Sequence, residues 1–357
     1  MKLLDKYIIK KLLSTFIFVV LIILAIVVVI DYTEKNDDFM EHNLKLIDIL
    51  PYYGAFIPWI ANLITPITIF IATVFVTSRL AGHTEIIAML AGGMSFRRFM
   101  RPYFIGASII AVASFFLNSF IIPEANKTRI AFEAAYIQKP FYYSDRDIHI
   151  KIAPETYAYM ESYNNQRDVG YRFTLEKITN QELKAKLSAR RIEWDSAKAS
   201  WTIKDWELRE IEGFKEFVSS GKEMDTVLNI SPDDFESDKG LQETLTMTEL
   251  NSYIGLLKER GADNVKVYLI ERYIRYMSPF AAIILVFIGV VVSSRKTRGG
   301  TGFQIALGFV IAFVFIIFFI MSKAIAENST MNPILAVWIP NIVFSCIGLI
   351  LYKFTPR

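Results

Sequence analysis

The chain has 357 residues, 53% of them hydrophobic, and its 39 Lys and Arg nearly balance its 36 Asp and Glu. A net charge of +3 gives no case for nucleic-acid binding, which would need a concentrated basic face. The histidines at positions 42, 83 and 149 are scattered, so the sequence supports neither a zinc site nor a histidine-based triad. There is no P-loop and no visible set of nucleophile, acid and base. We therefore expect a protein that is not an enzyme, with no catalytic residues, no metal site and no bound cofactor.

Six apolar segments are each long enough to cross a hydrocarbon core, which takes about 20 helical residues. They cover residues 12–31, 55–77, 103–122, 270–292, 303–322 and 334–352. The first is interpreted as a retained anchor, because its core is long and no small-residue cleavage pattern follows it. The segments contain few charges, which argues against a proton- or sodium-driven pump. The sequence therefore predicts a membrane α-helical protein with six transmembrane helices.

Lys and Arg are concentrated before the first apolar segment, after the second, after the fourth and after the sixth. The loop after the first segment is acidic instead. Because short cytoplasmic loops carry an excess of Lys and Arg, both termini are predicted to be cytoplasmic. The long stretch from about 123 to 265 is then predicted to face outward.

Alternation of apolar and polar residues begins near Asp147. The segment IHIKIA places Ile148, Ile150 and Ile152 on one face, and four later segments repeat the pattern. Several short strands without intervening helices predict an antiparallel sandwich, a jellyroll or an open barrel. The single cysteine, Cys346, allows no disulfide within the chain, so this region must be held by its core.

Three tryptophans, Trp194, Trp201 and Trp206, lie within these strands. We interpret them as sheet core, and the alternative is that some of them line an apolar trough for a lipid tail. After the sheet, the segment TMTELNSYIGLLKERG predicts a helix with its N-cap at Thr246 or Thr248. The expected domains are spans one to three (1–135), a β-domain (136–245), and a connecting helix with spans four to six (246–357).

A short amphipathic segment, about 80–94, lies between the second and third spans in SRLAGHTEIIAMLAGGMSF. On a helical wheel, one face carries Ala81, Glu85, Ala88 and Gly92. Small residues let another backbone approach closely, and Glu85 offers a charge-assisted contact to a cation of a partner. Two interpretations remain: a helix lying on the inner leaflet, or a coupling helix that docks into a motor protein. Ser95 is predicted to cap the next helix.

Several motifs in this order resemble one known family. LDKYIIKKLL is similar to an amphipathic entry to span one, and SRLAGHTEIIAMLAGGMSF is similar to a coupling segment. RIEWDSAKASWTI resembles a repeated W-D-x-x-x-x-x-W strand pair, and LNISPDDF followed by LTMTELNSYIGLLKERG resembles the stretch after the sheet. The family is the LptF/LptG permeases of the lipopolysaccharide-export ABC transporter, and the resemblance covers nearly the whole chain. The tryptophan pair is somewhat more similar to the G-type subunit than to the F-type.

The resemblance implies six transmembrane helices with a periplasmic all-β jellyroll-like domain inserted between spans three and four. It implies a multi-pass protein of a Gram-negative inner membrane. The implied partners are a cytoplasmic ABC ATPase dimer that binds the ATP, a second permease of the same type, periplasmic jellyroll bridge proteins, lipopolysaccharide and membrane lipids. Lipopolysaccharide would enter between spans one and five and pass into the jellyrolls.

The resemblance also implies site residues. The coupling face would be Ala81, Glu85, Ala88 and Gly92. Family members often have a basic outer end of span one, whereas this chain has Asp31 there. We therefore expect other cations near the outer membrane boundary to bind lipid A phosphates, namely Lys35, Lys127, Arg129, Arg272 and Arg275. For each cation alone the alternative is interfacial snorkelling. Ile150 and Leu175 are the predicted acyl-chain contacts on the inward face of the sheet.

Two functions of other classes remain open. A force-transmitting ABC membrane subunit that moves no lipid would share the coupling helix but would not need a lipid-sized groove. A membrane-anchored β-domain scaffold would need neither Glu85 nor its small-residue face. Co-purification with an ATPase would separate the last from the other two.

Overall fold

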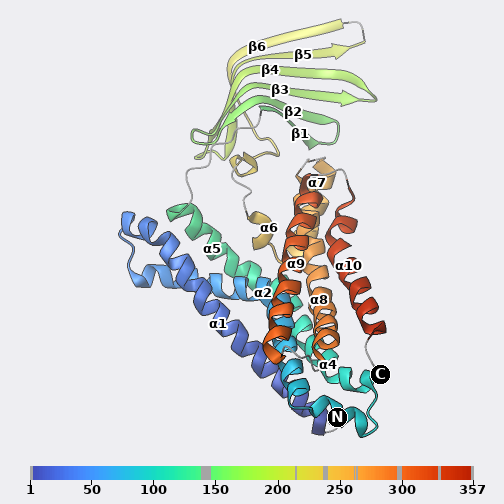
Figure 1. The fold of residues 1–357 in the computed structure, drawn as a ribbon. Coiled ribbons are helices and arrows are strands. Elements are labelled where there is room, and N and C mark those ends of the chain that lie inside the picture. The colour runs from blue at the N-terminus through green and yellow to red at the C-terminus, as the bar shows by residue number, and fades with distance from the viewer. Residues whose placement is uncertain are drawn as a thin grey trace. The chain divides into compact units, whose positions relative to one another are not determined.

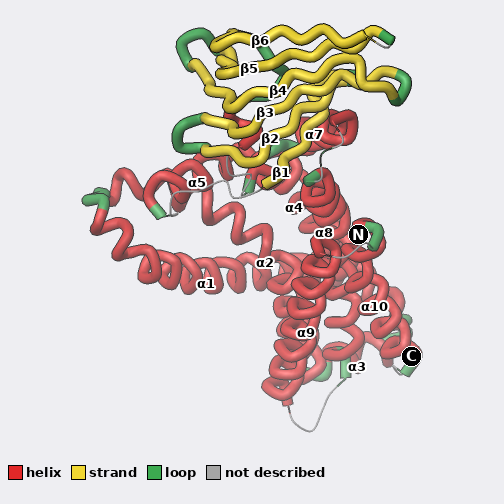
Figure 2. The backbone as a smooth tube through the Cα atoms, turned by 90° about the horizontal axis from the view of Figure 1, so that it is seen from above, coloured by secondary structure: helices red, strands yellow, loops and turns green. Residues whose placement is uncertain are grey.

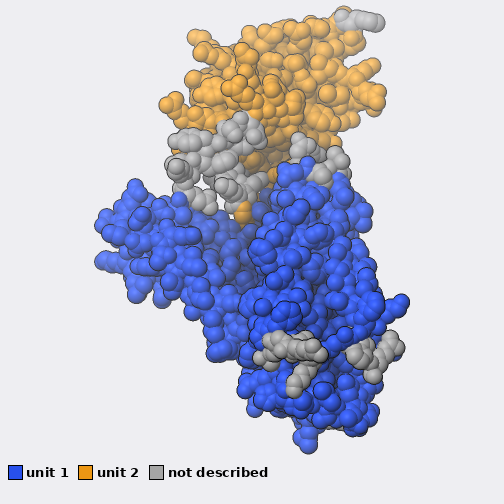
Figure 3. Space-filling view, viewed as in Figure 1, with its two compact units in different colours: residues 1–137, 242–251, 266–357 blue, residues 138–241, 252–265 orange. Residues whose placement is uncertain are grey.

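The computed structural model describes residues 3–137, 146–213, 215–235, 240–260, 262, 264–295, 300–328 and 331–354. The chain divides into two compact units (Figure 3). The first, here called the helical unit, comprises residues 1–137, 242–251 and 266–357. The second, the sheet unit, comprises residues 138–241 and 252–265. Within these described residues, six helices are long and apolar enough to cross a membrane, which confirms the prediction of six candidate spans.

The helices follow the apolar segments and extend beyond most of them (Figure 1). Their bounds are α1 (Leu3–Glu41), α2 (Leu46–Gly82), α3 (Glu85–Ala91), α4 (Phe96–Phe116), the π-helix η1 (Leu117–Ile121), α5 (Ile122–Tyr136), the 3₁₀ turn η2 (Pro232–Phe235), α6 (Leu241–Thr244), α7 (Met247–Arg260), α8 (Val265–Ser293), α9 (Gly300–Asn328) and α10 (Pro333–Lys353). The third candidate span runs through α4, η1 and α5 without a break. The strands follow α5 along the chain.

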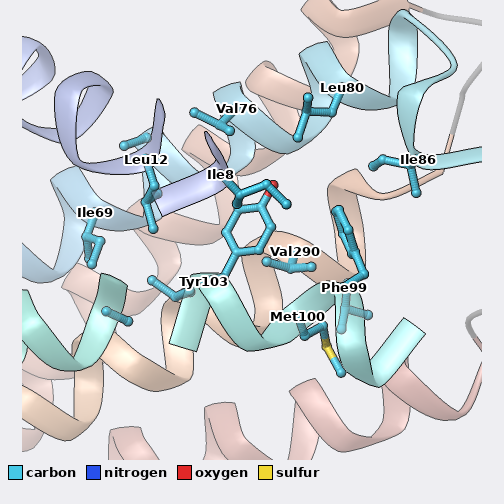
Figure 4. Close-up of a cluster of buried hydrophobic side chains, with 14 of the residues drawn as sticks. Ile8, Leu12, Ile69, Val76, Leu80, Ile86, Phe99, Met100, Tyr103 and Val290 are labelled. Atoms are coloured by element: carbon cyan, nitrogen blue, oxygen red, sulfur yellow. The ribbon is translucent and has the colours of Figure 1, made fainter. Parts of the chain in front are cut away.

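Two apolar clusters hold the helical unit together. The first joins the start of α1 to the end of α2, α3, α4 and α8, with Ile8, Leu12 and Tyr103 fully buried (Figure 4). Here α1 and α4 approach closely, because a Cβ on Gly106 would lie 2.9 Å from a Leu12 methyl carbon. The second cluster joins α2 to α8, α9 and α10. Both clusters contain residues from α2 and α8, which are therefore the central helices of the unit.

The sheet unit contains one antiparallel six-stranded sheet (Figure 2). Its strands are β1 (Arg146–Ala153), β2 (Thr156–Asn164), β3 (Val169–Thr179), β4 (Glu182–Asp195), β5 (Ser200–Glu212) and β6 (Lys215–Thr226). The spatial order equals the chain order, so the topology is a meander. A jellyroll in the strict sense places chain-distant strands side by side through Greek-key connections, and the described strands contain none. The prediction of antiparallel strands is confirmed, and the strict jellyroll topology is not what these strands form.

The strands bend in a common crease (Figure 1). At the crease, one residue of each strand lies between two successive cross-strand pairs. These six residues form a row across the sheet: Asp147, Glu161, Arg172, Arg190, Asp205 and Lys222. The three of them on β1, β3 and β5 have left-handed φ angles of 55°, 50° and 51°. On β5 this shifts the alternation by one residue at Asp205, so that Ile203 and Trp206 both belong to the core although they are three apart. The crease therefore directs side chains from both arms of the sheet toward one concave core.

Trp201 lies in that core, fully buried, and its indole N–H donates to the carbonyl of Ile230 at 2.8 Å. Trp194 packs on it with a ring-centroid distance of 5.1 Å. Trp206 covers Gly221, where a Cβ would lie 2.8 Å from the indole ring. The prediction that the tryptophans belong to the sheet core is thus confirmed.

The helix after the sheet is also confirmed. Thr246 precedes α7 and forms a reciprocal cap, because its backbone N–H donates to the Glu249 carboxylate at 2.8 Å and its hydroxyl accepts from the Glu249 N–H. Hydrogen bonds donated by the Thr246 backbone N–H and hydroxyl to the Glu249 carboxylate hold the pKa of Glu249 below its ordinary value. Leu250, Ile254 and Leu257 form its buried face.

Candidate functional site

The predicted coupling segment is two helices rather than one. α2 continues to Gly82, and Thr84 in the left-handed region (φ 60°) turns the chain before α3 begins at Glu85. Ala81 consequently lies in α2, where it is 2% exposed in the apolar cluster. Its predicted place on the exposed coupling face is therefore wrong, since the wheel assumed an unbroken helix over 80–94.

The remaining coupling residues do lie at the surface of α3. Glu85 is half-buried, whereas Ala88 and Gly92 are exposed. Ile86 is buried in the first cluster, and Met89 and Leu90 of α3 pack against that cluster. Gly92 and Gly93, the latter with φ 85°, end the helix, and Ser95 caps α4 by accepting a hydrogen bond from the Arg98 N–H at 3.3 Å. The predicted cap is confirmed.

Glu85 also has a contact within the chain. The hydroxyl of Tyr7, on α1, donates to the Glu85 carboxylate at 3.4 Å, and Lys11 donates to the Tyr7 oxygen at 2.8 Å. The first two turns of α1 therefore lie beside the start of α3. Periodicity alone could not show this, because Tyr7 and Glu85 are 78 residues apart.

Asp31, which stands where a basic residue was expected, is 9% exposed and has partners on α1 and α2. It accepts hydrogen bonds from the hydroxyls of Tyr52 and Tyr53, each at 3.1 Å, and pairs with Lys35 at 2.7 Å. Lys35 also donates to Tyr52 and lies 3.8 Å from Glu133 on α5. Lys35 is thus engaged by protein groups in this structure, and its role as a phosphate ligand stays a prediction.

Arg129 is 6% exposed and is held on all sides. Its guanidinium donates to Glu243 at 2.7 Å, to Glu133 at 3.2 Å and to the Asn126 side chain at 3.0 Å, and it stacks on Trp59 at 4.1 Å. Burial and the nearby Glu271 carboxylate raise the pKa of Glu243, and Arg129 opposes that rise. Glu133 joins Arg129 to Lys35, so the structure brings these two predicted residues together in one buried network.

Arg275 is 1% exposed and binds the chain segment around α6. It donates to Glu271 at 2.8 Å and to the carbonyls of Leu245 and Gln242 at 2.7 and 2.9 Å. Its geometry is that of a structural contact, since each of its three nitrogens has a partner. A phosphate role for Arg129 or Arg275 stays a prediction that this burial does not favour.

Lys127 and Arg272 are more accessible. The Lys127 side chain is 48% exposed and pairs with Glu124 at 2.8 Å. Arg272 donates to the Asn251 side chain at 3.2 Å and stacks on Tyr273 at 5.0 Å. Exposed pairs of this kind are weak and exchange readily with water, so these two cations remain open to a ligand.

The two predicted acyl-chain contacts share one row of the sheet. Ile150 pairs with Ala158, which pairs with Leu175, and the row continues through Leu187 to Leu208. Ile150 and Leu175 are half-buried against the sheet core. The row is therefore a continuous apolar strip on the concave side that is not completely covered.

A cavity of about 470 Å³ lies within the helical unit between α2, α8 and α9. Its wall is mostly apolar and includes Trp59, Leu63, Ile67, Met277, Ala281, Phe315, Phe319 and Ile320. Glu243, Glu271, Arg275 and Lys323 are its charged lining residues. An apolar cavity with a few charged groups suits an amphiphile, and its size falls within the range of about 300–1,000 Å³ for ligand sites.

Comparison with protein families gives one match, to the lipopolysaccharide export system permease LptF/LptG, over residues 6–353. The chain belongs to the LptF/LptG family. A comparison with individually curated proteins finds no match. The match includes all six candidate spans almost completely, the six strands and the coupling segment.

An LptF/LptG protein is a transporter permease, not a member of a catalytic enzyme family. With its six apolar helices the chain is a multi-pass membrane protein that works with other membrane components of a lipopolysaccharide transport system. Among the described residues, no three His, Cys, Asp or Glu side chains are grouped as metal ligands would be.

Of the charged residues that line the cavity, the sequence analysis named Arg275 but missed Glu243, Glu271 and Lys323. Lys323 follows the fifth apolar segment directly, and the criterion used for Lys127 and Arg272 could have found it. Glu243 and Glu271 gave no such signal, because acids beside apolar runs are common at helix ends. These two acids are notable because they pair with buried arginines: Glu243 with Arg129, and Glu271 with Arg275. Arg129 lies 114 residues from Glu243 in the sequence, so no local pattern indicates that pair.

Proposed function

We propose that this chain is the permease subunit of an ABC transporter that extracts lipopolysaccharide from the inner membrane and passes it to a periplasmic β-jellyroll bridge. A separate ATPase dimer docked on α3 supplies the power, and a second LptF/LptG-type permease completes the membrane unit. The family match over residues 6–353 supports this proposal most strongly. In this orientation both termini are cytoplasmic and the sheet unit is periplasmic.

The cavity supports the choice of an amphiphilic substrate. Its apolar wall on α2, α8 and α9 suits acyl chains, and Lys323 suits an anionic group. Lys323 is the cation most available there, because its side chain is 44% exposed and its ion pair with Glu327 is long, at 3.9 Å. Arg275, in contrast, is completely engaged. We propose that a phosphate of the lipid contacts Lys323, with Lys127 and Arg272 as further accessible cations.

The apolar strip through Ile150 and Leu175 supports a second step. Acyl chains leaving the membrane need a cover from water, because each exposed CH₂ costs about 0.8 kcal/mol. A half-buried apolar row on the concave side of a bent sheet provides that cover. We propose that the sheet carries the chains along this strip.

Photo-crosslinking tests the proposal. A photoreactive phenylalanine analogue at Phe319 faces the cavity, and the matched control is the same analogue at Phe313, which lies on the same helix, is 61% exposed and does not line the cavity. In vesicles that contain the ATPase, the partner permease and lipopolysaccharide, Phe319 should label lipopolysaccharide in an ATP-dependent way. Equal labelling at both positions, or none at Phe319, would contradict the proposal.

The same probe at Ile150 and Leu175 tests the second step. ATP-dependent labelling of lipopolysaccharide there is expected. Labelling of protein alone would favour the scaffold, and ATP hydrolysis without any lipid labelling would favour the force-transmitting subunit.

A further inference from the structure

One ion pair of the helical unit lies beside the coupling segment and has no part in the cavity. Asp5, in the first turn of α1, is 5% exposed. Both of its carboxylate oxygens accept hydrogen bonds from Arg98, at 2.7 Å each. Arg98 lies in the first turn of α4, directly after α3 and its Gly92-Gly93 stop. A bidentate pair of this kind fixes both the distance and the angle between two helices.

The position of Asp5 needs an explanation beyond the helix dipole. An acid in a first turn is favourable, but it gains that benefit while solvated. Here the carboxylate is buried, which is costly unless a partner compensates it. Arg98 is the partner, 93 residues away in the sequence.

α1 contacts the coupling segment at a second point. Tyr7 donates to Glu85 at the start of α3, while Asp5 holds the start of α4. Beside these polar contacts, Ile8 and Leu12 of α1 are completely buried. They belong to the first cluster together with Ile86 and Phe99 (Figure 4). The first turns of α1, α3 and the start of α4 therefore form one packed body.

α1 is also a continuous helix from Leu3 to Glu41. At 1.5 Å per residue it is about 58 Å long. Its far end carries Asp31 and Lys35, which bind the tyrosines of α2 and lie beside Glu133 of α5. A displacement of the start of α1 would therefore act on the opposite end of the helical unit.

We infer that Asp5 and Arg98 are positioning residues that connect the coupling segment to α1, so that movement imposed on α3 by a docked ATPase is transmitted along α1. The inference rests on the proposed function, because it requires that an ATPase acts on α3. According to this inference, α1 moves together with α3, in addition to α2, which directly precedes α3 in the chain. A loss of the pair would separate ATP hydrolysis from the movement of α1 and from lipid release.

The experiment compares Asp5→Asn and Arg98→Gln with the charge-swapped double variant Asp5→Arg with Arg98→Asp, all in the complete complex with its ATPase. The matched control is Arg97→Gln, which removes a neighbouring exposed cation that donates to Tyr352 at 3.3 Å. Two quantities are measured: lipopolysaccharide released per ATP hydrolysed, and the ATP-dependent change in distance between spin labels at Thr33 on α1 and Thr128 on α5. The amount of folded complex is measured in parallel.

Each single variant should lower the release per ATP at least five-fold and reduce the spin-label distance change, with ATPase association within two-fold of wild type. The swapped variant should restore both quantities at least half-way, and Arg97→Gln should change neither. Wild-type values in the single variants would overturn the inference. A parallel loss of ATPase association and folded protein, without rescue by the swap, would reduce the pair to a fold contact and also overturn it.

The spin-label distance tests the movement of α1 independently of whether lipopolysaccharide is the substrate. If the wild-type complex moves α1 with ATP but releases no lipopolysaccharide, the proposed function is wrong. In that case a loss of the α1 movement in the single variants would still support the inference, and an unchanged movement would overturn it.

Discussion

In the helical unit the side chains of Arg129 and Arg275 are 8% and 1% exposed, whereas Arg172 and Arg190 in the sheet unit are 78% and 77% exposed. All four form ion pairs with carboxylates. The difference is the solvent around them. The ion pairs of Arg129 and Arg275 are shielded from water, whereas those of Arg172 and Arg190 are exposed to it.

This difference decides what the charges contribute. A buried arginine has exchanged its hydrogen bonds to water for hydrogen bonds to protein groups. Removing it leaves buried carboxylates and carbonyls without hydrogen-bond donors. An exposed pair gains little Coulomb energy in water and is screened by salt. The helical unit therefore depends on particular arginines, while the sheet depends on its apolar core and backbone pairing. Substitutions can test this contrast.

The largest effect is expected for Arg275→Ala. It removes the donors to Glu271, Leu245 and Gln242 inside the helical unit. The expected loss of unfolding free energy is about 3–5 kcal/mol, measured by denaturant unfolding of the protein in detergent. Arg272→Ala, three residues away on the same helix, is the control and should cost less than about 1 kcal/mol. Equal costs for the two would contradict the contrast.

An intermediate effect is expected at α3, where a half-buried acid would become buried on docking. Glu85→Ala should weaken ATPase association by about 1.5–3 kcal/mol, which is roughly ten- to hundred-fold, and Ala88→Trp should weaken it by blocking close approach. Membrane insertion should be unchanged. Tyr7→Phe removes only the contact within the chain and should weaken association less. ATPase binding as tight as wild type in both α3 variants would mean that α3 is not the docking site.

The third prediction concerns pH. Because the pKa of Glu243 is raised in the folded protein, the folded state binds its proton more tightly than the unfolded chain does. This contribution to stability is fully present below the ordinary carboxylate pKa and is lost as the pH rises through the raised value. The melting temperature of wild type should therefore fall relative to Glu243→Gln between acidic and neutral pH. A difference between the two proteins that does not vary with pH would show that Glu243 is not perturbed.

The smallest effect is expected in the sheet. Glu161→Gln removes the pair with Arg172, whose closest atoms are 3.0 Å apart, at an exposed position of the crease. The expected cost is about 0.5 kcal/mol or less, and added salt should reduce it further. A cost near that of Arg275→Ala would show that the crease depends on its charges and not on backbone conformation.

The sequence by itself determined the elements whose signals are local. The apolar runs are long enough to require helices, because backbone groups in lipid must pair within their own segment. The alternation around Ile148, Ile150 and Ile152 determined strands, and Ser95 and Thr246 marked helix starts through their capping hydroxyls. Those signals act within about four residues, so they can be recognised without knowing which distant parts of the chain meet.

Only the tertiary structure decided which charges meet. Asp5 and Arg98 are 93 residues apart, and Arg129 and Glu243 are 114 apart, so no periodicity connects them. The turn at Thr84, which moved Ala81 into the core, also depended on packing, since Leu80 and Ile86 enter the same cluster from two helices. A buried charge is tolerated only where the fold brings its partner, and that meeting depends on all the helices together. For this reason three of the predicted cations, Lys35, Arg129 and Arg275, were found already engaged by protein groups, while the cavity showed what the accessible Lys323 could contact.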